Sequence, residues 1–564
     1  MKKNNIIEFC YELSLSVLLF IFNILFISSL FFVLKISISK INFYVSLILT
    51  LTLIGFYFFK KGYGFFKVVI RFVTFLLILF LSIFVASKCY DLTWDGNSYH
   101  KTAIGELKNG WNPLYQDIGN FNSSKENKNY ISDTHDIWTD HYAKGHWIFA
   151  ANIYSLTNNI ESGKSINFLL VISLFLLSVS FLLRYTGKLF AFLVSLIIVF
   201  NPVSIVQISC FYNDILIYNL IVIEMIFIQL ILFENKKESY LGLLLTLCIL
   251  INIKFTGLAY GAIVMLIYYI PILVCKKFRN KYLKQFTVLG ILSVLIGICF
   301  IGSSTYLKNI KYENNPLYPL FGENKVDIMT QNQPKIFSEM NKAEKFIYAN
   351  FSTLSNITFF QDENPTLKIP FTYSQTELYQ LIVPDLRIGG FGPLFGGILL
   401  ISLIIIIIGL YFLFKKDRNL FIIISLLLLS IIIFVIVLDE AWWARYLPQL
   451  YLLPVIALYL LYYFNYRKIN VFLSFALVVV LILNCYYIFD NNTFQNLKKY
   501  KVIDNQLSQI KSCTNCEVYT KDFSGAIYNL YDVNNSIKVL NEPKVESGDI
   551  IYNNMLYIYS NKDK

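Results

Sequence analysis

Residues 88–164 read KCYDLTWDGNSYHKTAIGELKNGWNPLYQDIGNFNSSKENKNYISDTHDIWTDHYAKGHWIFAANIYSLTNNIESGK and separate two regions of long apolar runs. The stretch contains all four histidines of the chain and four of its six tryptophans. On both sides of it, runs of Leu, Ile, Phe and Val are longer than the core of a soluble domain requires. The stretch therefore predicts a polar outer loop between membrane spans, and it holds most of the versatile side-chain chemistry of the protein.

The composition predicts an all-α polytopic membrane protein. The 564 residues are 56% hydrophobic and 15% charged, with a mean hydropathy of +0.57, and these values exclude a set of soluble domains. Apolar segments of about 20 residues cross a hydrocarbon core of about 30 Å. We expect about thirteen of them, near residues 12–34, 41–59, 66–87, 164–183, 188–208, 212–233, 239–253, 256–275, 284–305, 391–414, 419–438, 446–464 and 468–489.

The basic charges indicate an orientation in the membrane. Although the net charge is +12, the lysines and arginines gather in alternate short loops, such as residues 60–71, 276–284 and 415–418. By the positive-inside rule these loops are cytoplasmic. We therefore expect a lipid bilayer and no nucleic acid as a partner. The multi-pass chain would lie in the cell (inner) membrane, with a cytoplasmic N-terminus and an extracytoplasmic active site and C-terminus.

Three domains follow from this pattern. Residues 1–65 form an N-terminal transmembrane hairpin, and residues 66–489 form the main transmembrane module, with large outer loops at 88–163 and 306–390. Residues 490–564 contain short apolar runs that predict a small α/β domain outside the membrane. Its CxxC pair, Cys513 and Cys516, predicts a local disulfide, because a metal site would need two more ligands nearby.

Two stretches of the first outer loop have apolar residues at helical spacing. Residues 98–110, SYHKTAIGELKNG, end on a glycine that is typical of a helix C-terminus. Residues 146–157, HWIFAANIYSLT, carry Trp147, Ile148, Ala151 and Tyr154 on one side. We expect two amphipathic helices that lie along the outer face of the membrane.

Several of these pieces resemble a known family. An acid near the start of the first outer loop, two amphipathic helices and a late arginine at the outer end of a span are similar to the GT-C superfamily of integral membrane glycosyltransferases. The resemblance is to the dolichyl-phosphate-mannose and aminoarabinose transferase type, over roughly residues 66–489. The matching pieces are DLTWDGNSYH (91–100), DHYAKGHWIFAANIY (140–154), FYND (211–214), KFTGL (254–258), NNPLYP (314–319), GFGPLF (390–395) and WWARYLPQLYLLP (442–454).

The resemblance implies a transferase that uses a polyprenyl-phosphate sugar, such as an undecaprenyl-phosphate sugar, as its donor. Its acceptor would be an envelope glycan, lipid or protein on the extracytoplasmic side, and a single direct displacement would invert the anomeric centre. One alternative is an oligosaccharyltransferase or ligase that uses a lipid-diphosphate glycan. Another is a polytopic transporter or lipid flippase, but transporters concentrate polar residues near the bilayer midplane, and this chain gathers them at one face.

Such a transfer needs a base for the acceptor proton and positive charge for the departing phosphate. Asp95 is our choice of base, because it lies in a glycine-containing turn before a helix; Asp91, four residues earlier, is the alternative. A purely structural interpretation makes Asp95 a helix cap. Arg445 would bind the donor phosphate, unless it is an interfacial anchor. Lys254 would share the phosphate charge, unless it only extends to the membrane surface.

Further polar residues of the first outer loop are candidates for binding the acceptor or the sugar. They are Trp94, His100, Asp140, His141 and Lys144. The tryptophans could stack on a sugar ring or anchor the loop in the membrane. No cofactor is certain, because His135, His141 and His146 lack a tight zinc spacing. A divalent metal ion held by Asp95 with His100 or His141 is an open alternative.

Overall fold

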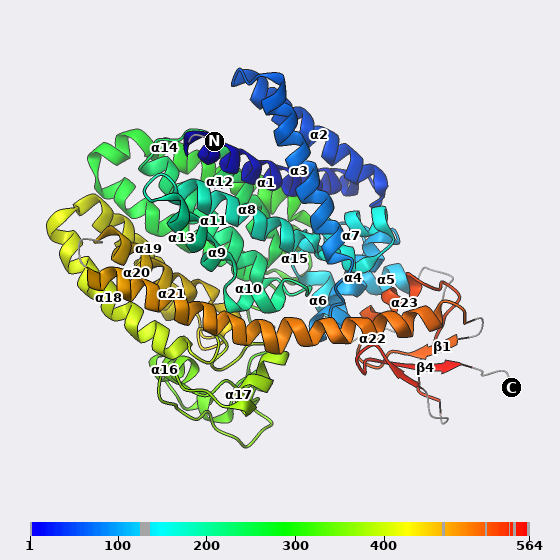
Figure 1. Ribbon diagram of the computed structural model, residues 1–564. Helices are drawn as coiled ribbons and strands as arrows, with labels where there is room; N and C mark the ends of the chain where they lie inside the picture. Colours follow the sequence, from blue (N-terminus) through cyan, green and yellow to red (C-terminus); the bar gives the residue numbers. More distant parts are fainter. Residues whose placement is uncertain are drawn as a thin grey trace.

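The computed structural model describes residues 3–123, 136–464, 468–513, 516–540, 542–544 and 549–560. Most of these residues lie in helices, and a small sheet stands near the C-terminus (Figure 1). The chain is therefore a helical, multi-pass membrane protein, as its composition predicts.

Ten helical segments among the described residues are long and apolar enough to cross a membrane. Their bounds are Lys3–Val33, Lys40–Lys60, Phe65–Ala86, Ile160–Leu182, Asp214–Leu232, Phe255–Val274, Lys276–Ile301, Phe395–Lys416, Arg418–Val437 and Lys468–Ile510. Three shorter apolar helices, Lys188–Val199, Ser239–Ile253 and Pro448–Tyr463, lie where the other three spans are expected. A total of thirteen crossings thus stays a prediction.

The centre of the helical body is α11 (Asp214–Leu232), whose residues are all buried. It packs against α8 (Ser165–Leu182), α12 (Ser239–Ile253) and α13 (Phe255–Val274). A helix that is apolar on every side is stable only when neighbours cover it completely. The body around α11 therefore fixes the ends of these helices, including Asp214 at the start of α11.

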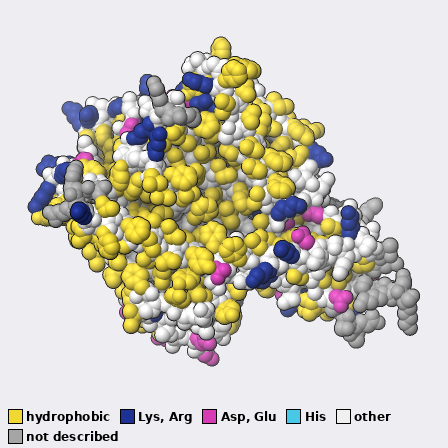
Figure 2. Space-filling view, in the orientation of Figure 1, with side chains coloured by type: hydrophobic (Ala, Val, Ile, Leu, Met, Phe, Trp, Pro, Cys, Tyr) yellow, Lys and Arg dark blue, Asp and Glu magenta, His cyan; other side chains and the backbone are white. Residues whose placement is uncertain are grey.

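The outer helices of the body expose their apolar side chains. Figure 2 shows hydrophobic side chains covering most of the visible face of the helical body. Examples are Phe65, Phe66 and Phe80 on α3 (Phe65–Ala86) and Phe472 and Phe475 on α21 (Lys468–Ile488). An exposed apolar surface of this extent fits contact with lipid. Other helices that expose apolar side chains are α2 (Lys40–Lys60), α14 (Lys276–Ser293), η3 (Val294–Ile301), α18 (Phe395–Lys416) and α19 (Arg418–Val437). In contrast, α1 (Lys3–Val33) and α20 (Leu452–Tyr463) are mostly buried.

The span expected at 188–208 is divided into α9 (Lys188–Val199) and α10 (Pro202–Gln207). Pro202 has no N–H to continue the first helix, and it stands at the start of the second. The side chain of Asn201 accepts a hydrogen bond from the backbone N–H of Ser204 and so caps α10. One continuous span at this position was therefore a wrong prediction.

The helix expected at 468–489 does not end there. It continues from α21 through the π-helical η10 (Phe489–Phe494) into α22 (Gln495–Ile510), for 43 residues in all. Figure 1 shows this long helix in orange, running from the helical body to the C-terminal sheet. The expected boundary between residues 489 and 490 thus falls inside a helix.

The three long polar segments gather at one end of the helical body, where α4, α6, α16, α17 and the strands lie in Figure 1. The first contains η1 (Gly96–His100), α4 (Lys101–Lys108), α5 (Ile118–Ser123), α6 (Asp136–His141), α7 (Gly145–Thr157) and η2 (Ile160–Lys164). The second contains η4 (Ser303–Leu307), α15 (Lys308–Glu313), η5 (Thr330–Asn332), η6 (Lys335–Ser338), α16 (Lys342–Phe351), α17 (Gln375–Tyr379) and η7 (Gln380–Ile382). The short turns η8 (Ala444–Tyr446) and η9 (Pro448–Tyr451) lie between α19 and α20.

The two helices expected in the first outer loop are present, as η1 with α4 and as α7. They do not lie on the surface, however, because residues 101–107 of α4 and 145–155 of α7 are all buried. The two helices pack against each other, α1 and α2 cover α7, and the C-terminal segment covers α4. Their amphipathic pattern thus reflects packing in a protein interior.

The C-terminal segment forms a four-stranded sheet with the order β2-β1-β4-β3. Strand β1 (Cys516–Tyr519) pairs in parallel with β2 (Lys538–Leu540) and antiparallel with β4 (Leu556–Ser560), which in turn pairs antiparallel with β3 (Asp549–Ile551). The crossover between β1 and β2 contains η11 (Ser524–Ala526) and α23 (Ile527–Tyr531). Cys513 and Cys516 form a disulfide, which confirms the prediction from their spacing.

Candidate functional site

The turn before Asp95 is fixed by hydrogen bonds to the fully buried Asp91. One carboxylate oxygen of Asp91 accepts the backbone N–H of Thr93, and the other accepts that of Phe211, each at 2.8 Å. The Asn97 amide donates to the backbone carbonyls of Asp91 at 3.0 Å and Thr93 at 2.8 Å. The hydrogen bonds of Asp91 therefore connect this turn to the loop before α11.

Asp95 itself is only partly buried and has no such role. Its side chain does not cap the following helix, and among the described residues its carboxylate accepts no hydrogen bond and joins no ion pair. Burial raises the pKa of Asp95, Arg445 and Lys254 lower it, and Asp385 and Asp214 raise it. The structure thus brings the expected base close to both expected cations.

Arg445 lies in η8 and is buried. Its guanidinium pairs with the carboxylates of Asp214 at 3.7 Å and Asp385 at 3.4 Å. Both distances exceed those of a good N–H···O hydrogen bond. Among the described residues the buried Nε of Arg445 has no hydrogen-bond partner, so its donors are incompletely used. The guanidinium stacks on aromatic rings at 4.5–5.0 Å, those of Tyr212, Trp443 and Tyr446.

Lys254 lies in the short extended break between α12 and α13. Its ammonium donates to Asp214 at 3.0 Å and lies over the Tyr446 ring at 4.6 Å. Burial lowers the pKa of Lys254, but the charge and hydrogen bond of Asp214 together with Tyr446 outweigh burial and raise the pKa above its usual value. The lysine therefore stays charged beside Arg445.

Asp385 is the residue of this site that the sequence analysis missed. Arg387 binds one of its oxygens at 2.8 Å, and its backbone carbonyl accepts the indole N–H of Trp443 at 2.6 Å. The available signal was an acid two residues before an arginine, in the segment VPDLR at the end of the second outer loop. Asp214 was included in the sequence analysis only as the last residue of the segment FYND (211–214).

Asp140 and Lys144 form a second group, away from Asp95. The carboxylate of Asp140 accepts the backbone N–H of Ile118 at 2.8 Å, and the ammonium of Lys144 donates to the backbone carbonyl of Asp140 at 2.8 Å. Burial raises the pKa of Asp140 and lowers that of Lys144 to about 7. The pair closes the first outer loop upon itself.

His141 belongs to this second group. Its Nδ1 hydrogen-bonds to the side-chain oxygen of Asn309 at 2.8 Å, and its ring meets that of Tyr318 edge-on at 4.7 Å. These contacts join residues 88–163 to residues 306–390. Burial lowers the pKa of His141, so its ring is neutral near pH 7.

His100 and Trp94 differ in their exposure to solvent. His100 is buried, and its Nδ1 accepts the indole N–H of Trp147 at 2.8 Å; burial holds its pKa well below the usual range. Trp94 is 51% exposed, and the edge of its ring meets Phe523 of the C-terminal segment at 4.6 Å. His135 lies outside the described residues, and within those residues no three His, Cys, Asp or Glu side chains form a group that could hold a metal ion.

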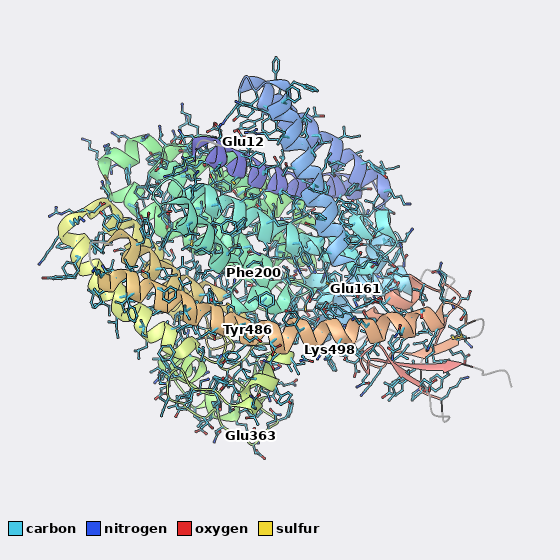
Figure 3. All side chains as sticks on the ribbon, in the orientation of Figure 1. Glu12, Glu161, Phe200, Glu363, Tyr486 and Lys498 are labelled. Carbon is cyan, nitrogen blue, oxygen red and sulfur yellow. A yellow bond between two sulfur atoms is a disulfide. The ribbon has the colours of Figure 1, made fainter. Side chains whose placement is uncertain are left out.

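Buried ion pairs and hydrogen bonds link the C-terminal segment to this site. Lys101, which follows η1, donates to Asn97, Asn529 and Tyr552 at 2.8–2.9 Å and pairs with Glu161 at 2.7 Å. Glu161 also accepts from Asn529 at 2.8 Å and Tyr552 at 2.9 Å. Figure 3 shows Glu161 where the helical body meets the C-terminal segment. The network extends from the sheet to the turn that carries Asp95.

Comparison of the sequence with protein-family models finds no match, and comparison with curated proteins finds none either.

Proposed function

We propose that this protein is a membrane glycosyltransferase that moves a sugar from a polyprenyl-phosphate donor to an envelope glycan, lipid or protein acceptor on the extracytoplasmic side. One observation carries the proposal. A carboxylate with no partner among the described residues, Asp95, lies near a buried guanidinium, Arg445, whose donors are incompletely used. A phosphate at Arg445 would satisfy those donors, and an acceptor hydroxyl would satisfy Asp95.

In the proposed reaction, Asp95 accepts the proton of the acceptor hydroxyl while the hydroxyl oxygen attacks the anomeric carbon. The bond between this carbon and the phosphate oxygen breaks, and the polyprenyl phosphate leaves with the electron pair. Arg445 and Lys254 stabilise the negative charge that develops on the phosphate. Asp214 and Asp385 hold the two cations in place. Without a covalent intermediate the anomeric centre is inverted.

The test is sugar transfer by the purified full-length protein in proteoliposomes, from a labelled polyprenyl-phosphate sugar to envelope acceptors. We expect Asp95→Asn to lower the rate by about 10²- to 10⁴-fold, because it removes the base. We expect Arg445→Lys to lower it by about 10²-fold or more, because an ammonium lacks the planar set of donors.

The matched control is Glu363→Gln, which changes an exposed carboxylate of the second outer loop (Figure 3) and should leave transfer unchanged. Full activity of both the Asp95 and the Arg445 variants would refute the proposed roles. Movement of labelled lipid across the membrane without release of its sugar would instead support a flippase.

A further inference from the structure

A cavity of about 250 Å³ adjoins the candidate site. Two of its lining residues, Tyr212 and Asp385, also contact Arg445, and a third, Trp94, precedes Asp95. Because Trp94 is half exposed, the cavity reaches the surface of the protein. Its walls come from five parts of the chain: the first outer loop, the loop before α11, the end of the second outer segment, α22 and the C-terminal sheet region. The lining residues used below include Tyr90, Ser209, Asn496, Lys499, Tyr500 and Asn553.

The lining combines two kinds of side chain that suit a sugar. The rings of Tyr90, Trp94, Tyr212 and Tyr500 offer flat apolar faces for the C–H side of a pyranose. The amides of Asn496 and Asn553 and the hydroxyls of Thr93 and Ser209 can bind sugar hydroxyls. A purely lipid tail would leave these polar groups without partners, at a cost in free energy.

The charges of the lining favour an anion. Only Asp385 and Lys499 carry a charge among the lining residues. The carboxylate of Asp385 is occupied by Arg387 at 2.8 Å and Arg445 at 3.4 Å. Lys499 forms no ion pair or hydrogen bond within the part of the chain that the structure describes. A ligand in this cavity therefore meets a cation whose charge is not neutralised.

We infer that this cavity binds the acceptor, and that the acceptor is a saccharide with a carboxylate or phosphate group placed at Lys499. That the bound saccharide is the acceptor of the reaction rests on the proposed function. That the cavity binds an anionic saccharide does not. Asp95 does not itself line the cavity but follows Trp94 in the chain, so a sugar with its ring on Trp94 and its anion at Lys499 would have to extend a hydroxyl from the cavity to Asp95 to lose its proton there. The donor phosphate at Arg445 then lies across Asp385 from the acceptor.

Saccharide binding is measured without any donor, on the full-length protein in lipid nanodiscs, by saturation-transfer NMR. The probes are glucose, glucuronate and glucose 6-phosphate. We expect at least one of the two anions to bind about tenfold more tightly than glucose, because a charge-assisted hydrogen bond adds to the neutral contacts. Whichever of glucuronate and glucose 6-phosphate binds more tightly shows whether the site prefers a carboxylate or a phosphate group.

Lys499→Gln should abolish this preference, and Trp94→Ala should weaken all three sugars. The control is Lys498→Gln, because Lys498 is exposed on the same helix and does not line the cavity (Figure 3). The inference is overturned if glucose binds as tightly as both anions, or if Lys499→Gln retains the preference. Anion-selective binding with no sugar transfer from any donor would support the saccharide site and refute the proposed transferase. Sugar transfer without a preference for anions would support the transferase and refute the anionic saccharide site.

Discussion

Asp95 differs from the other acids of the site because, among the described residues, its carboxylate has neither an ion pair nor a hydrogen bond. Asp214 and Asp385 are neutralised by Lys254, Arg387 and Arg445, and their carboxylates are therefore poor bases. Asp91 is held by two backbone N–H groups and lies in the interior. Of the two acids that the sequence offers as the base, the geometry favours Asp95.

The charges around Asp95 predict opposite pH shifts for two substitutions. Asp95 acts as a base only when deprotonated, so transfer falls as the pH drops through its raised pKa. Asp385→Asn removes a nearby negative charge, lowers the pKa of Asp95 and moves this acid limb to lower pH. Lys254→Gln removes a positive charge and moves the limb to higher pH. The measurement is the pH profile of kcat/KM.

Both variants will transfer more slowly, but the position of the limb does not depend on the maximal rate. Shifts in the same direction, or no shift in either variant, would contradict the assignment of Asp95 as the titrating base.

Glu161 predicts a large loss of stability on substitution. Its carboxylate pairs with Lys101 at 2.7 Å and Lys164 at 2.5 Å, and both lysine side chains are fully buried. Glu161→Gln leaves two buried ammonium groups without their counter-charge, and we expect the free energy of unfolding to fall by about 3–5 kcal/mol. Thermal unfolding in detergent measures this. The control Lys342→Gln breaks the exposed pair with Asp439 and should leave the melting temperature unchanged.

The sequence predicts Asp95, Lys254 and Arg445 because each is a charged residue at the end of an apolar run, where few other charges occur. It does not predict Asp385, since its ion pair joins segments 60 residues apart in the chain. It also groups Asp140, His141 and Lys144 with Asp95, because they share a loop. The loop folds so that these side chains satisfy one another and the second outer segment instead.

At the scale of elements, α4 packs in direct contact with α23 of the C-terminal segment. A Cβ added at Gly105 would lie 2.0 Å from the ring of Tyr528, whose hydroxyl donates to Glu106 at 2.6 Å. Gly105→Ala should therefore push α23 away from α4, and limited proteolysis should cut the C-terminal segment faster.

The matched control is Gly290→Ala, also within a helix, where an added Cβ meets nothing within 4 Å. It should leave the C-terminal segment protected and add about 1 kcal/mol of helix stability. Equal protease sensitivity of the two variants would contradict the close contact between α4 and α23.

Apolar run length predicts where most helices lie, but not where the last one ends. Asp490, Asn491 and Asn492 have the composition of a loop. The helix continues through them because Asn492 finds partners on the second outer segment. Its amide donates to the backbone carbonyls of Leu381 at 2.9 Å and Ile382 at 3.3 Å. Partners this distant in sequence leave no local signal.

At the scale of the whole molecule, the polar segments at one end predict a single sidedness in the membrane. In a background with the exposed Cys275 and Cys299 replaced by serine, a cysteine at Lys498 should react with an impermeant maleimide in intact cells. A cysteine at Lys277 should react only after permeabilisation, because its loop is rich in lysine and arginine. Labelling in the reverse order would overturn the expected orientation.

The helix from Lys468 to Ile510 also joins the lipid bilayer to the cavity mechanically. At 1.5 Å per residue its 43 residues are about 65 Å long, about twice the thickness of the hydrocarbon core. Lys499 lies about twenty residues, or about 30 Å, beyond the middle of α21. If the helix moves as one rod, a tilt of about 5° displaces Lys499 by about 3 Å, and hydrophobic mismatch changes tilt. Membrane thickness would then set the width of the cavity.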